Sequence, residues 1–556
     1  MQRSHYRLVL GVLVAVTSLI VAGAAGGASK KSTSGSMTFG AEQEPPCLNG
    51  FTSGCNNTWT SWTAGIALAS PLIVKPDFSI KPYMGTAKLV SKKPFTVLVT
   101  LNKKAKWSDG KQVSAEDLIF TWKTIVDPKF DIASRSGFDS IARAVKVNAR
   151  AVKFIYSKPY APYKVQWATS ILPQHALEGL DFNTVWDSNY NNKAGQTMAD
   201  GPFKLQSYTK GQSIVMVRNP TFWGKKPTLD KITFLFRTNT DTEIQAIRGG
   251  EVDAIYPQPQ LQLAQLRGQS GLRVQTHAGT TIEHIDINTG AGNSTPLLGQ
   301  AWFRQAIAYS LDRSGMIKQL FSTLNPGLPT LNNLSYVTGQ KGIYKANFAK
   351  YQISNKAKRI AKVAAIMKAH NCTKGGDGIY TCGGEKASVR LGTTSGNKLR
   401  ELAVEILQAQ AKDAGIEFKA DSQPSRLFFP RVAAAKYDLA LFAWVGSGDP
   451  AGQVDIYGCA DQKTADNPQG IGGNNWKNYC NPTVTNALKA SDAALDPKAR
   501  IKLVNAADAQ LAKDVPTIPL YQKPTYFVFK TSLKGLVDNP TSQGPTWNTE
   551  AWKAGY

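Results

Sequence analysis

The stretch YDLALFAWVGSGDP, residues 437–450, combines residue types that bind other molecules without covalent chemistry. Its apolar run, 439–445, is typical of a strand buried on both faces, and Trp444 stands near the end of that run. Gly446 and Gly448 leave the backbone bare, so they permit a tight turn and the close approach of a ligand. The pattern indicates the edge of a ligand cleft, with an ordinary strand–loop junction as the alternative.

Sequence motifs for catalysis are missing. No G-x-S-x-G elbow, H-E-x-x-H helix, phosphate-binding Gly-Lys loop or dinucleotide glycine fingerprint occurs in the 556 residues. A glycosidase-like pair of acids stays open, because two carboxylates distant in sequence can meet in the fold. Aromatic residues are plentiful and titratable ones sparse around 437–450, so the sequence favours binding over catalysis. We therefore expect no enzymatic activity and no cofactor.

The cysteines and histidines do not form a metal-binding pattern. No C-x-x-C occurs, and the histidines at 175, 277, 284 and 370 lack ligand spacing, so no metal site is expected. Six cysteines allow fifteen disulfide pairings. The simplest hypothesis is three local pairs, each closing a short Gly- or Asn-rich loop: Cys47 with Cys55, Cys372 with Cys382, and Cys459 with Cys480.

The stretch WSDGKQVSAEDLIFTWKTI, residues 107–125, places acids beside a predicted helix start. Asp109-Gly110 predicts a turn, and Ser114 followed by Asp117 predicts a capped helix. General acid–base chemistry is one interpretation of these acids. Capping together with a favourable interaction with the helix dipole is the interpretation that we favour.

Periodicity predicts the elements that would position Trp444. Alternation, apolar stripes at helical spacing and Gly415 as a helix end mark out five elements in a row. They are a strand at 387–391, a helix at 399–407, a strand at 416–420, a helix at 425–435 and a strand at 437–445. This order predicts an α/β fold with a parallel sheet and right-handed crossovers. Ligands of open α/β sheets bind beyond the carboxyl ends of the strands, where Trp444 to Asp449 would lie.

A similar alternation is predicted earlier in the chain. KITFLF, residues 231–236, is expected to form a strand. Thr240 is expected to begin a helix, with Glu243 completing a capping box. Gly249 and Gly250 would end that helix before a strand at 252–256.

The N-terminal segment, residues 1–28, is typical of export. Two arginines precede an apolar stretch at 8–25 and the small-residue run AGAAGGAS, which predicts a secretory signal cleaved after Ala24 or Ala28. An uncleaved anchor is the alternative, because the apolar stretch is just long enough to span a bilayer. Residues 29–36 are predicted to be a polar linker. We expect an exported protein, in the periplasm or at the outer face of the cytoplasmic membrane or cell wall.

Length and charge restrict the class further. A chain of 556 residues exceeds the roughly 250–300 residues that one core supports, so two or more lobes are expected. The 65 Lys and Arg against 39 Asp and Glu give a formal net charge of +26. The basic residues are dispersed and form no tract of five or more, so no nucleic-acid partner is expected. Such a basic surface suits an anionic cell envelope.

Five stretches along the chain match the signature blocks of one family in that family's order. They are WSDGKQVSAEDLIFTW (107–122), GPFKLQSYTKGQSIVMVRNPTFWG (201–224), FRQAIAYSLDRSGMI (303–317), YDLALFAW followed by DP (437–450) and VPTIPLY (515–521). Together they resemble the extracytoplasmic solute-binding proteins of ATP-driven importers, family 5, the oligopeptide/dipeptide/nickel class.

The resemblance implies a bilobal periplasmic-binding-protein-like α/β fold with an extra inserted subdomain. Its two hinge crossovers would lie near Glu283 and Val515. The boundaries that it implies are 37–80, 200–283 and 515–556 for the first lobe, 81–199 for the inserted subdomain and 284–514 for the second lobe.

The resemblance also implies which residues face the ligand. Trp444 would form a wall of the cavity, and the backbone of Ala443, Val445 and Gly446 would bind ligand as an added strand does. The other candidate positions are Ser447, Asp449, Tyr521 as a second aromatic wall, and Glu42, Gln43 and Glu44 at the end of the first strand. Core packing is the alternative for the two aromatic residues, and an exposed strand end is the alternative for the two glutamates.

This chain departs from the oligopeptide binders of the family at one position. Those proteins carry an acid two or three residues after this tryptophan, which anchors the peptide's ammonium, whereas Gly446 and Ser447 stand here and Asp449 is the first acid. A charge-assisted bond to a buried ammonium contributes roughly 1.5–3 kcal/mol, so its loss would weaken free-peptide binding about tenfold or more. We therefore expect a peptide held mainly by its backbone, or a different solute.

The sequence thus predicts a monomeric, non-catalytic binding protein. It would close its lobes on a peptide or similar small solute and deliver it to the membrane permease subunits of an ABC-type importer. Two alternatives from other classes remain open: a secreted hydrolase of envelope peptides or glycans, and a sensory or scaffold binding protein that does not transport.

Overall fold

A computed structural model describes residues 35–325, 327–459 and 474–555. The predicted signal segment and residues 29–34 of the predicted linker lie outside these ranges. Ser36, which the sequence analysis assigns to the linker, already begins the first strand, β1 (Ser36–Ala41). Within the described ranges, no helix is both long enough and apolar enough to cross a membrane.

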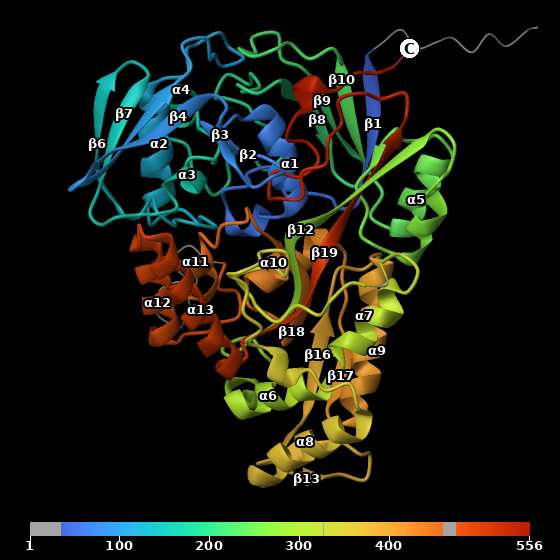
Figure 1. Ribbon diagram of the computed structural model, residues 1–556. Helices are drawn as coiled ribbons and strands as arrows, with labels where there is room; N and C mark the ends of the chain where they lie inside the picture. Colours follow the sequence, from blue (N-terminus) through green and yellow to red (C-terminus); the bar gives the residue numbers. More distant parts are fainter. Residues whose placement is uncertain (1–34, 326, 460–473, 556) are drawn as a thin grey trace, which may run out of the picture. The chain divides into compact units, whose positions relative to one another are not determined.

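A ten-stranded mixed sheet runs through the molecule (Figure 1). In spatial order its strands are β17 (Glu417–Ala420), β16 (Ser388–Gly392), β18 (Leu439–Val445), β12 (Leu272–Ile287), β19 (Thr517–Lys530), β11 (Ala254–Ile255), β1, β10 (Lys231–Phe236), β9 (Ser213–Arg218) and β8 (Phe203–Thr209).

Two long antiparallel strands, β12 and β19, join the two ends of this sheet. The first half of β12 and the second half of β19 pair with each other beside β11, so they belong to the end that contains β1. The second half of β12 pairs with β18 on one side and with the first half of β19 on the other. The register shifts between Ala278 and Ile282, so a bulge lies where the strand passes from one end to the other.

The buried apolar side chains form two main clusters that follow the same division. One cluster joins the N-terminal segments to the C-terminus, with Phe39, Trp59 and Trp552 at its centre. The other surrounds β12, β16 and β18 and contains residues from Ile244 to Val528. Each cluster is a separate hydrophobic core, as expected for a chain of this length.

The five elements predicted at 387–445 are confirmed. They are β16, α9 (Lys398–Asp413), β17, α10 (Ser425–Ala433) and β18, and β16 pairs parallel with both β17 and β18. Gly415 follows α9 with a φ of +87°, a left-handed conformation that ends the helix at little cost for glycine. The last of the five elements, β18, ends at Val445, the residue at which the sequence analysis ends the predicted strand.

A second, four-stranded antiparallel sheet forms from residues 85–156. Its order is β4 (Gly85–Lys92), β5 (Phe95–Leu101), β7 (Ala151–Tyr156) and β6 (Ile141–Asn148). Helix α2 (Ala115–Val126) packs on it and begins with the predicted capping box, in which Ser114 and Asp117 bond each other's backbone N–H groups. The capping interpretation of these acids is therefore confirmed.

The predicted cap of α5 (Thr240–Arg248) is wrong by one residue. Asn239 is the N-cap, and its side chain accepts hydrogen bonds from the N–H groups of Asp241 and Thr242. The side chain of Glu243 is buried and does not complete the predicted capping box. Its complete burial raises its pKa well above the usual value. The glycines after Arg248 end the helix as predicted.

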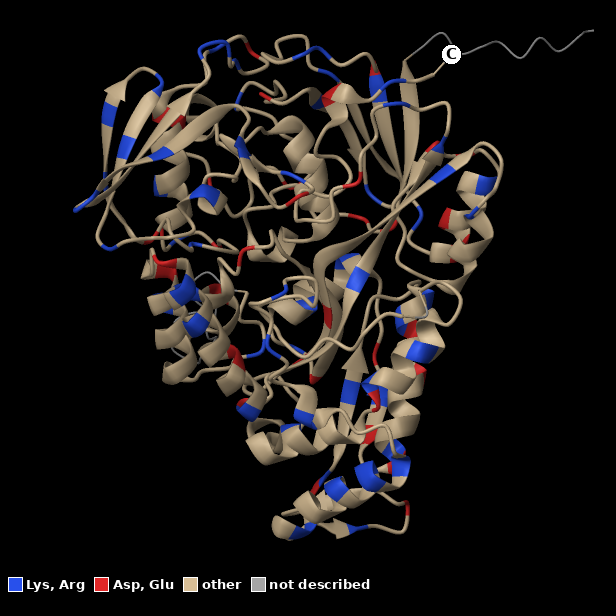
Figure 2. Ribbon diagram, in the orientation of Figure 1, with Lys and Arg blue, Asp and Glu red and all other residues tan. Residues whose placement is uncertain are grey.

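The remaining helices surround the two cores. They are α1 (Thr58–Ala67), α3 (Tyr163–Gln166), α4 (Gln174–Leu177), α6 (Ala301–Ser310), α7 (Arg313–Phe321), α8 (Lys356–Ala369), α11 (Gln453–Tyr457), α12 (Pro482–Ala493) and α13 (Pro497–Asp514). The six cysteines form the three local disulfides that the sequence analysis favours, Cys47–Cys55, Cys372–Cys382 and Cys459–Cys480. Lys and Arg are spread over both ends of the ribbon with acids among them (Figure 2).

The two neighbouring acids at the start of α2 offer a test of this local structure. Asp117 is 2% exposed and accepts hydrogen bonds from Trp107 Nε1 (3.1 Å), Ser114 N (2.9 Å) and Gln174 N (2.8 Å). We expect Asp117→Ala to lower the free energy of unfolding by about 2–3 kcal/mol, because buried donors lose their acceptor. Glu116 pairs with Lys146 at the surface, so Glu116→Ala should cost about 1 kcal/mol or less. Equal losses in urea denaturation would contradict this assignment.

Candidate functional site

The end of β18 has one edge that no neighbouring strand covers among the described residues. On one side, β18 pairs with β12 along its whole length, from Leu439 to Val445. On the other side, β16 pairs with it only at Leu439 and Ala440. The C=O of Leu441 points to that second side, because it accepts a hydrogen bond from Thr393 Oγ1 (2.8 Å).

The backbone of Ala443 and Val445 faces this open edge. Alternate residues of a strand direct their N–H and C=O groups to the same side, so these two residues follow the direction of Leu441. An extended chain placed here would continue the sheet where β16 stops. The edge therefore offers main-chain donors and acceptors at the two alternating positions that a bound strand needs.

Two cavities meet at this edge. The first, which we call the β18 cavity, has a volume of about 490 Å³ and is lined by the run from Ala443 to Asp449. The second, the edge cavity, has about 50 Å³ and is lined by Ala443, Val445, Glu42, Gln43 and Arg400. The two share the residues Thr58, Phe429, Ala443 and Val445. Most of the sequence-predicted positions thus line one or the other of two adjoining cavities.

Trp444 forms an aromatic wall of the β18 cavity. Its ring lies 4.9 Å from the ring of Trp476 and stacks with His284 at an interplanar angle of 8°. Its indole Nε1 has no hydrogen-bond partner among the described residues, and the same holds for Gln43 Oε1 in the edge cavity. The walls of the cavities therefore contain buried polar atoms that no described protein group satisfies.

The acids near Trp444 are already occupied by protein groups. Asp449 forms a two-point ion pair with Arg500, with distances of 2.7 and 2.6 Å. Asp455 accepts a hydrogen bond from Ser134 Oγ, which joins α11 to the loop before the four-stranded sheet's β6. Asp449 is therefore directed at Arg500 and does not replace the ammonium-binding acid of the oligopeptide binders.

The residues after β1 reach the cavities in different ways. Glu42 accepts a hydrogen bond from Gln258 Nε2, and the other side of the Gln258 amide accepts one from Lys523. Gln43 lines the edge cavity with an unpaired oxygen. Glu44 accepts a hydrogen bond from Gly211 N (2.7 Å) and lies 4.0 Å from Arg426, so protein groups already contact its carboxylate.

A buried set of four charges forms the base of the edge cavity. Glu283 of β12 accepts hydrogen bonds from Arg400 of α9 at 2.5 and 3.2 Å, and both side chains are at most 3% exposed. Glu42 and Lys523 of β19 complete the set. Two acids and two bases balance each other, so no free charge is left for a ligand.

The pKa values reflect this balance. Burial raises the pKa of Glu42 above its usual value, and Lys523 opposes the shift. Burial also acts to raise the pKa of Glu283, but the charges of Arg400 and Lys523 hold it below its usual value. Burial lowers the pKa of Lys523, although the negative charges of Glu42 and Glu283 act to raise it. The edge cavity therefore favours an uncharged ligand group, such as an amide of a peptide backbone.

Two candidate positions lie differently from what the sequence suggests. Tyr521 is 1% exposed and packs edge-on against Phe321, with ring centroids 5.0 Å apart, so it belongs to the core rather than to a cavity wall. The C=O of Gly446 already accepts a hydrogen bond from Ser542 N (2.9 Å), although the residue lines the β18 cavity. Ser447 lines it too and bonds the backbone of Asp449.

Sequence reasoning missed the charged and polar base of the site. Arg400, Gln258 and Lys523 lie in segments far apart along the chain, and none stands in a recognisable motif. Among the described residues, no group of three or more His, Cys, Asp or Glu is arranged to hold a metal ion.

Comparisons with known proteins identify the family. The family model described as "Bacterial extracellular solute-binding proteins, family 5 Middle" matches residues 79–464, and the chain belongs to this family. The chain is 26% identical over 442 residues to Protein XP55 of Streptomyces lividans, covering 79% of this chain and 75% of that protein. It is 24% identical over 509 residues to the oligopeptide-binding protein OppA of Mycobacterium tuberculosis, covering 90% and 82%.

A solved structure confirms the fold class. The oligopeptide-binding protein AppA from Bacillus subtilis, in complex with a nonapeptide, superposes with a TM-score of 0.83 at 21% identity. The match covers 94% of this chain and 99% of AppA. The predicted periplasmic-binding-protein-like α/β fold and the predicted family are therefore both confirmed.

The buried ion pair can be tested by a double-mutant cycle. We expect Arg400→Met or Glu283→Gln alone to lower the free energy of unfolding by about 3–5 kcal/mol, because each leaves an uncompensated buried partner. The double variant should lose clearly less than the sum of the two. The exposed pair of Lys356 and Asp413 is the control and should show little coupling. Additive losses in chemical denaturation would refute the coupling.

The burial of Asp455 predicts a pH dependence of stability. Burial, with Asp139 and Asp492 nearby, raises the pKa of Asp455 from 3.8 to about 8. Between these values the folded protein holds a proton that the unfolded chain has lost, so this group lowers stability as the pH rises and has its full effect above about pH 8.

In the Asp455→Asn variant, the side chain at this position is uncharged at every pH. The variant should therefore not lose stability in this way as the pH rises. Relative to the parent protein, its free energy of unfolding should rise by at least about 1 kcal/mol between acidic pH and pH 8, measured by calorimetry at each pH. Asp187→Asn, at an exposed position, serves as the control. Parallel pH profiles of Asp455→Asn and the parent protein would disprove the assignment.

Proposed function

We propose that this protein is the extracytoplasmic substrate-binding component of an ABC-type importer that takes up peptides. It would bind a peptide between two lobes, act as a monomer without catalysis, and pass its ligand to membrane permease subunits. Its place would be the periplasm, or the outer face of the cytoplasmic membrane or cell wall. The open edge of β18, beside the β18 cavity, carries this proposal, because it fits an extended main chain.

Two similar proteins support the peptide assignment. OppA of Mycobacterium tuberculosis is an oligopeptide-binding protein, and AppA is one whose structure contains a nonapeptide. The uncovered edge of β18 at Ala443 and Val445 suits the C=O and N–H groups of a peptide. No free acid faces the described part of either cavity for a peptide ammonium, so the main chain would supply most of the binding energy.

We assign two lobes and an inserted subdomain to this function. The first lobe comprises 37–80, 200–283 and 515–556, the second lobe comprises 284–514, and the inserted subdomain comprises 81–199. The two crossovers near Glu283 and Val515 form the hinge of this proposal. It is supported by the two hydrophobic clusters and by the passage of β12 and β19 from one cluster to the other.

Contacts between these lobes support closure on a ligand. Ser134 bonds Asp455, Asn56 Nδ2 donates to Asn474 Oδ1 (3.2 Å), and Ala161 N donates to the C=O of Asp492 (2.6 Å). The buried ion pair of Glu283 with Arg400 also joins the two lobes, at the proposed hinge. Ligand contacts on both lobes would add to these direct contacts and shift the equilibrium toward the closed form.

The proposal is tested with the exported form and a mixture of short synthetic peptides. We expect native mass spectrometry to detect bound peptides, and small-angle scattering to detect a smaller radius of gyration when they bind. Trp444→Ala should weaken binding about ten- to a hundredfold, because the ligand loses an aromatic wall.

Trp302→Ala is the matched control. Trp302 is half-buried and stacks on His370 at 4.1 Å, away from both cavities, so its removal should leave peptide affinity unchanged. Absence of both bound peptide and compaction in the parent protein would refute the proposed function. Equal effects of the two tryptophan changes would refute the role of Trp444.

A further inference from the structure

A third cavity, which we call the α1 cavity, lies beside the β18 cavity. It has a volume of about 390 Å³ and shares with the β18 cavity the residues Asn56, Ser61, Ser134, Val165, Thr169 and Ser542. Ala451 and Gly452, which follow β18, line both. A ligand bound along the edge of β18 therefore lies next to an additional chamber that the backbone contacts leave unfilled.

The walls of the α1 cavity combine aromatic and aliphatic side chains with uncharged polar ones. Rings that line it include those of Phe51, Trp62, Tyr83, Phe138, Trp186 and Trp547. Glu550 is the one formally charged residue among the lining residues, in a chain whose net charge is +26. Burial raises the pKa of Glu550 above its usual value, which favours the uncharged carboxyl. The wall suits an uncharged, apolar group.

Helix α1 contributes a face of small residues to this cavity. Ser61 and Gly65, one turn apart, both line it and are exposed, whereas Trp59 and Ile66 point into the core. A Cβ added to Gly65 would meet no atom within 4 Å. Glycine within a helix costs about 0.5–1 kcal/mol relative to alanine, and no steric contact requires it here. Because residue 65 has no side chain, the space beside α1 at this position stays open to the cavity.

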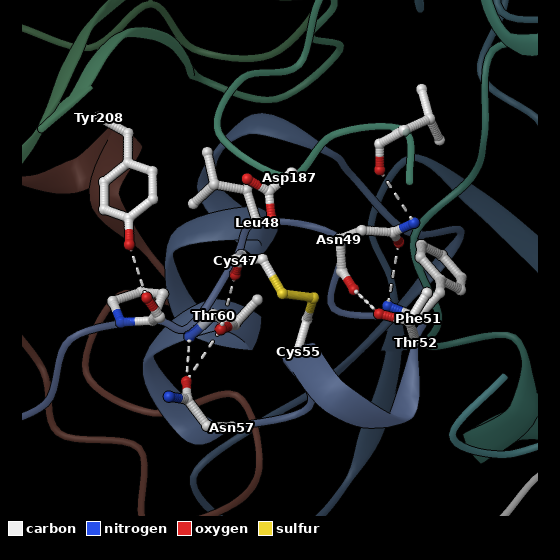
Figure 3. Close-up of a disulfide and its surroundings, with 12 residues drawn as sticks. Cys47, Leu48, Asn49, Phe51, Thr52, Cys55, Asn57, Thr60, Asp187 and Tyr208 are labelled. Atoms are coloured by element: carbon white, nitrogen blue, oxygen red, sulfur yellow. Dashed lines mark hydrogen bonds between the residues drawn. A yellow bond between two sulfur atoms is a disulfide. The ribbon is translucent and has the colours of Figure 1, made fainter. Parts of the chain in front are cut away.

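The opposite wall is held in place covalently. The disulfide Cys47–Cys55 closes the loop that contributes Leu48, Asn49 and Phe51 to the cavity (Figure 3). Leu48 N donates to the C=O of Asp187 (3.0 Å), and Thr60 Oγ1 of α1 donates to the C=O of Cys47 (3.2 Å). The loop is thus tied both to α1 and to a neighbouring segment, which holds this wall of the cavity in place.

We propose that the α1 cavity is a specificity subsite that accepts one bulky aromatic or aliphatic side chain of the ligand bound along β18. The subsite rests on the proposed peptide-binding function. Its size is sufficient, because a cavity of about 150 Å³ lined by apolar side chains holds benzene. Backbone contacts at β18 do not distinguish one peptide sequence from another, whereas this cavity does.

Gly65→Leu tests the subsite, because the new side chain enters the cavity without meeting another atom at its Cβ. The probes are peptide sets in which each position in turn carries Ala, Leu, Phe, Trp, Glu or Lys. At one position the parent protein should bind Leu, Phe or Trp about ten- to a hundredfold more tightly than Ala in titration calorimetry. Gly65→Leu should abolish this preference and leave the affinity for the Ala peptide unchanged.

Gly376→Leu is the matched control. Gly376 is exposed and also has no atom within 4 Å of an added Cβ, but it lies far from the cavity in sequence and lines none of the three cavities. It should keep the preference. A uniform loss of affinity for all peptides in Gly65→Leu would overturn the inference, and so would a preference for Lys at the responsive position.

Free indole is a second probe that separates the subsite from the proposed function. Saturation-transfer NMR should detect indole bound to the parent protein and not to Gly65→Leu. If no peptide binds the parent protein, the proposed function fails, while indole binding that Gly65→Leu removes still supports the pocket. Absence of indole binding to the parent protein overturns the subsite.

Discussion

The ion pair between Glu283 and Arg400 is the constraint on which the site depends. Glu283 lies in β12 and Arg400 in the first turn of α9, so the pair ties the strand that crosses the molecule to the βαβ unit that carries β18. Buried charges at this depth are tolerated because each finds a partner. The same balance of charges leaves the backbone of β18 as the main polar surface of the edge cavity that we propose for ligand binding.

The sequence predicts well what depends on local pattern. The five elements at 387–445 follow from short-range periodicity and from Gly415, and the position of Trp444 at the carboxyl end of β18 follows from their order. The cap of α5 was displaced by one residue because Asn239 and Thr240 are both good caps and the sequence alone does not rank them.

What the sequence does not predict depends on distant segments. The base of the site joins residues 42, 258, 283, 400 and 523, which periodicity cannot bring together. Tyr521 lies in an apolar strand with both faces buried, and such a strand has no alternation to show which way a ring points. No sequence motif predicts the α1 cavity, because it depends on space that small residues such as Gly65 leave open.

The pairing of β12 with β19 restricts how the two ends of the large sheet can move. The two strands form a ribbon joined by hydrogen bonds on both sides of the bulge near Ala278. Sliding one strand along the other would break every bond of the ladder, whereas bending or twisting the ribbon as a whole breaks few. In the hinge closure that we propose, relative motion would be confined to rotations about the ribbon. The rim of the cavities would part and meet again along one path, and the edge of β18 would keep the same register against β12 throughout.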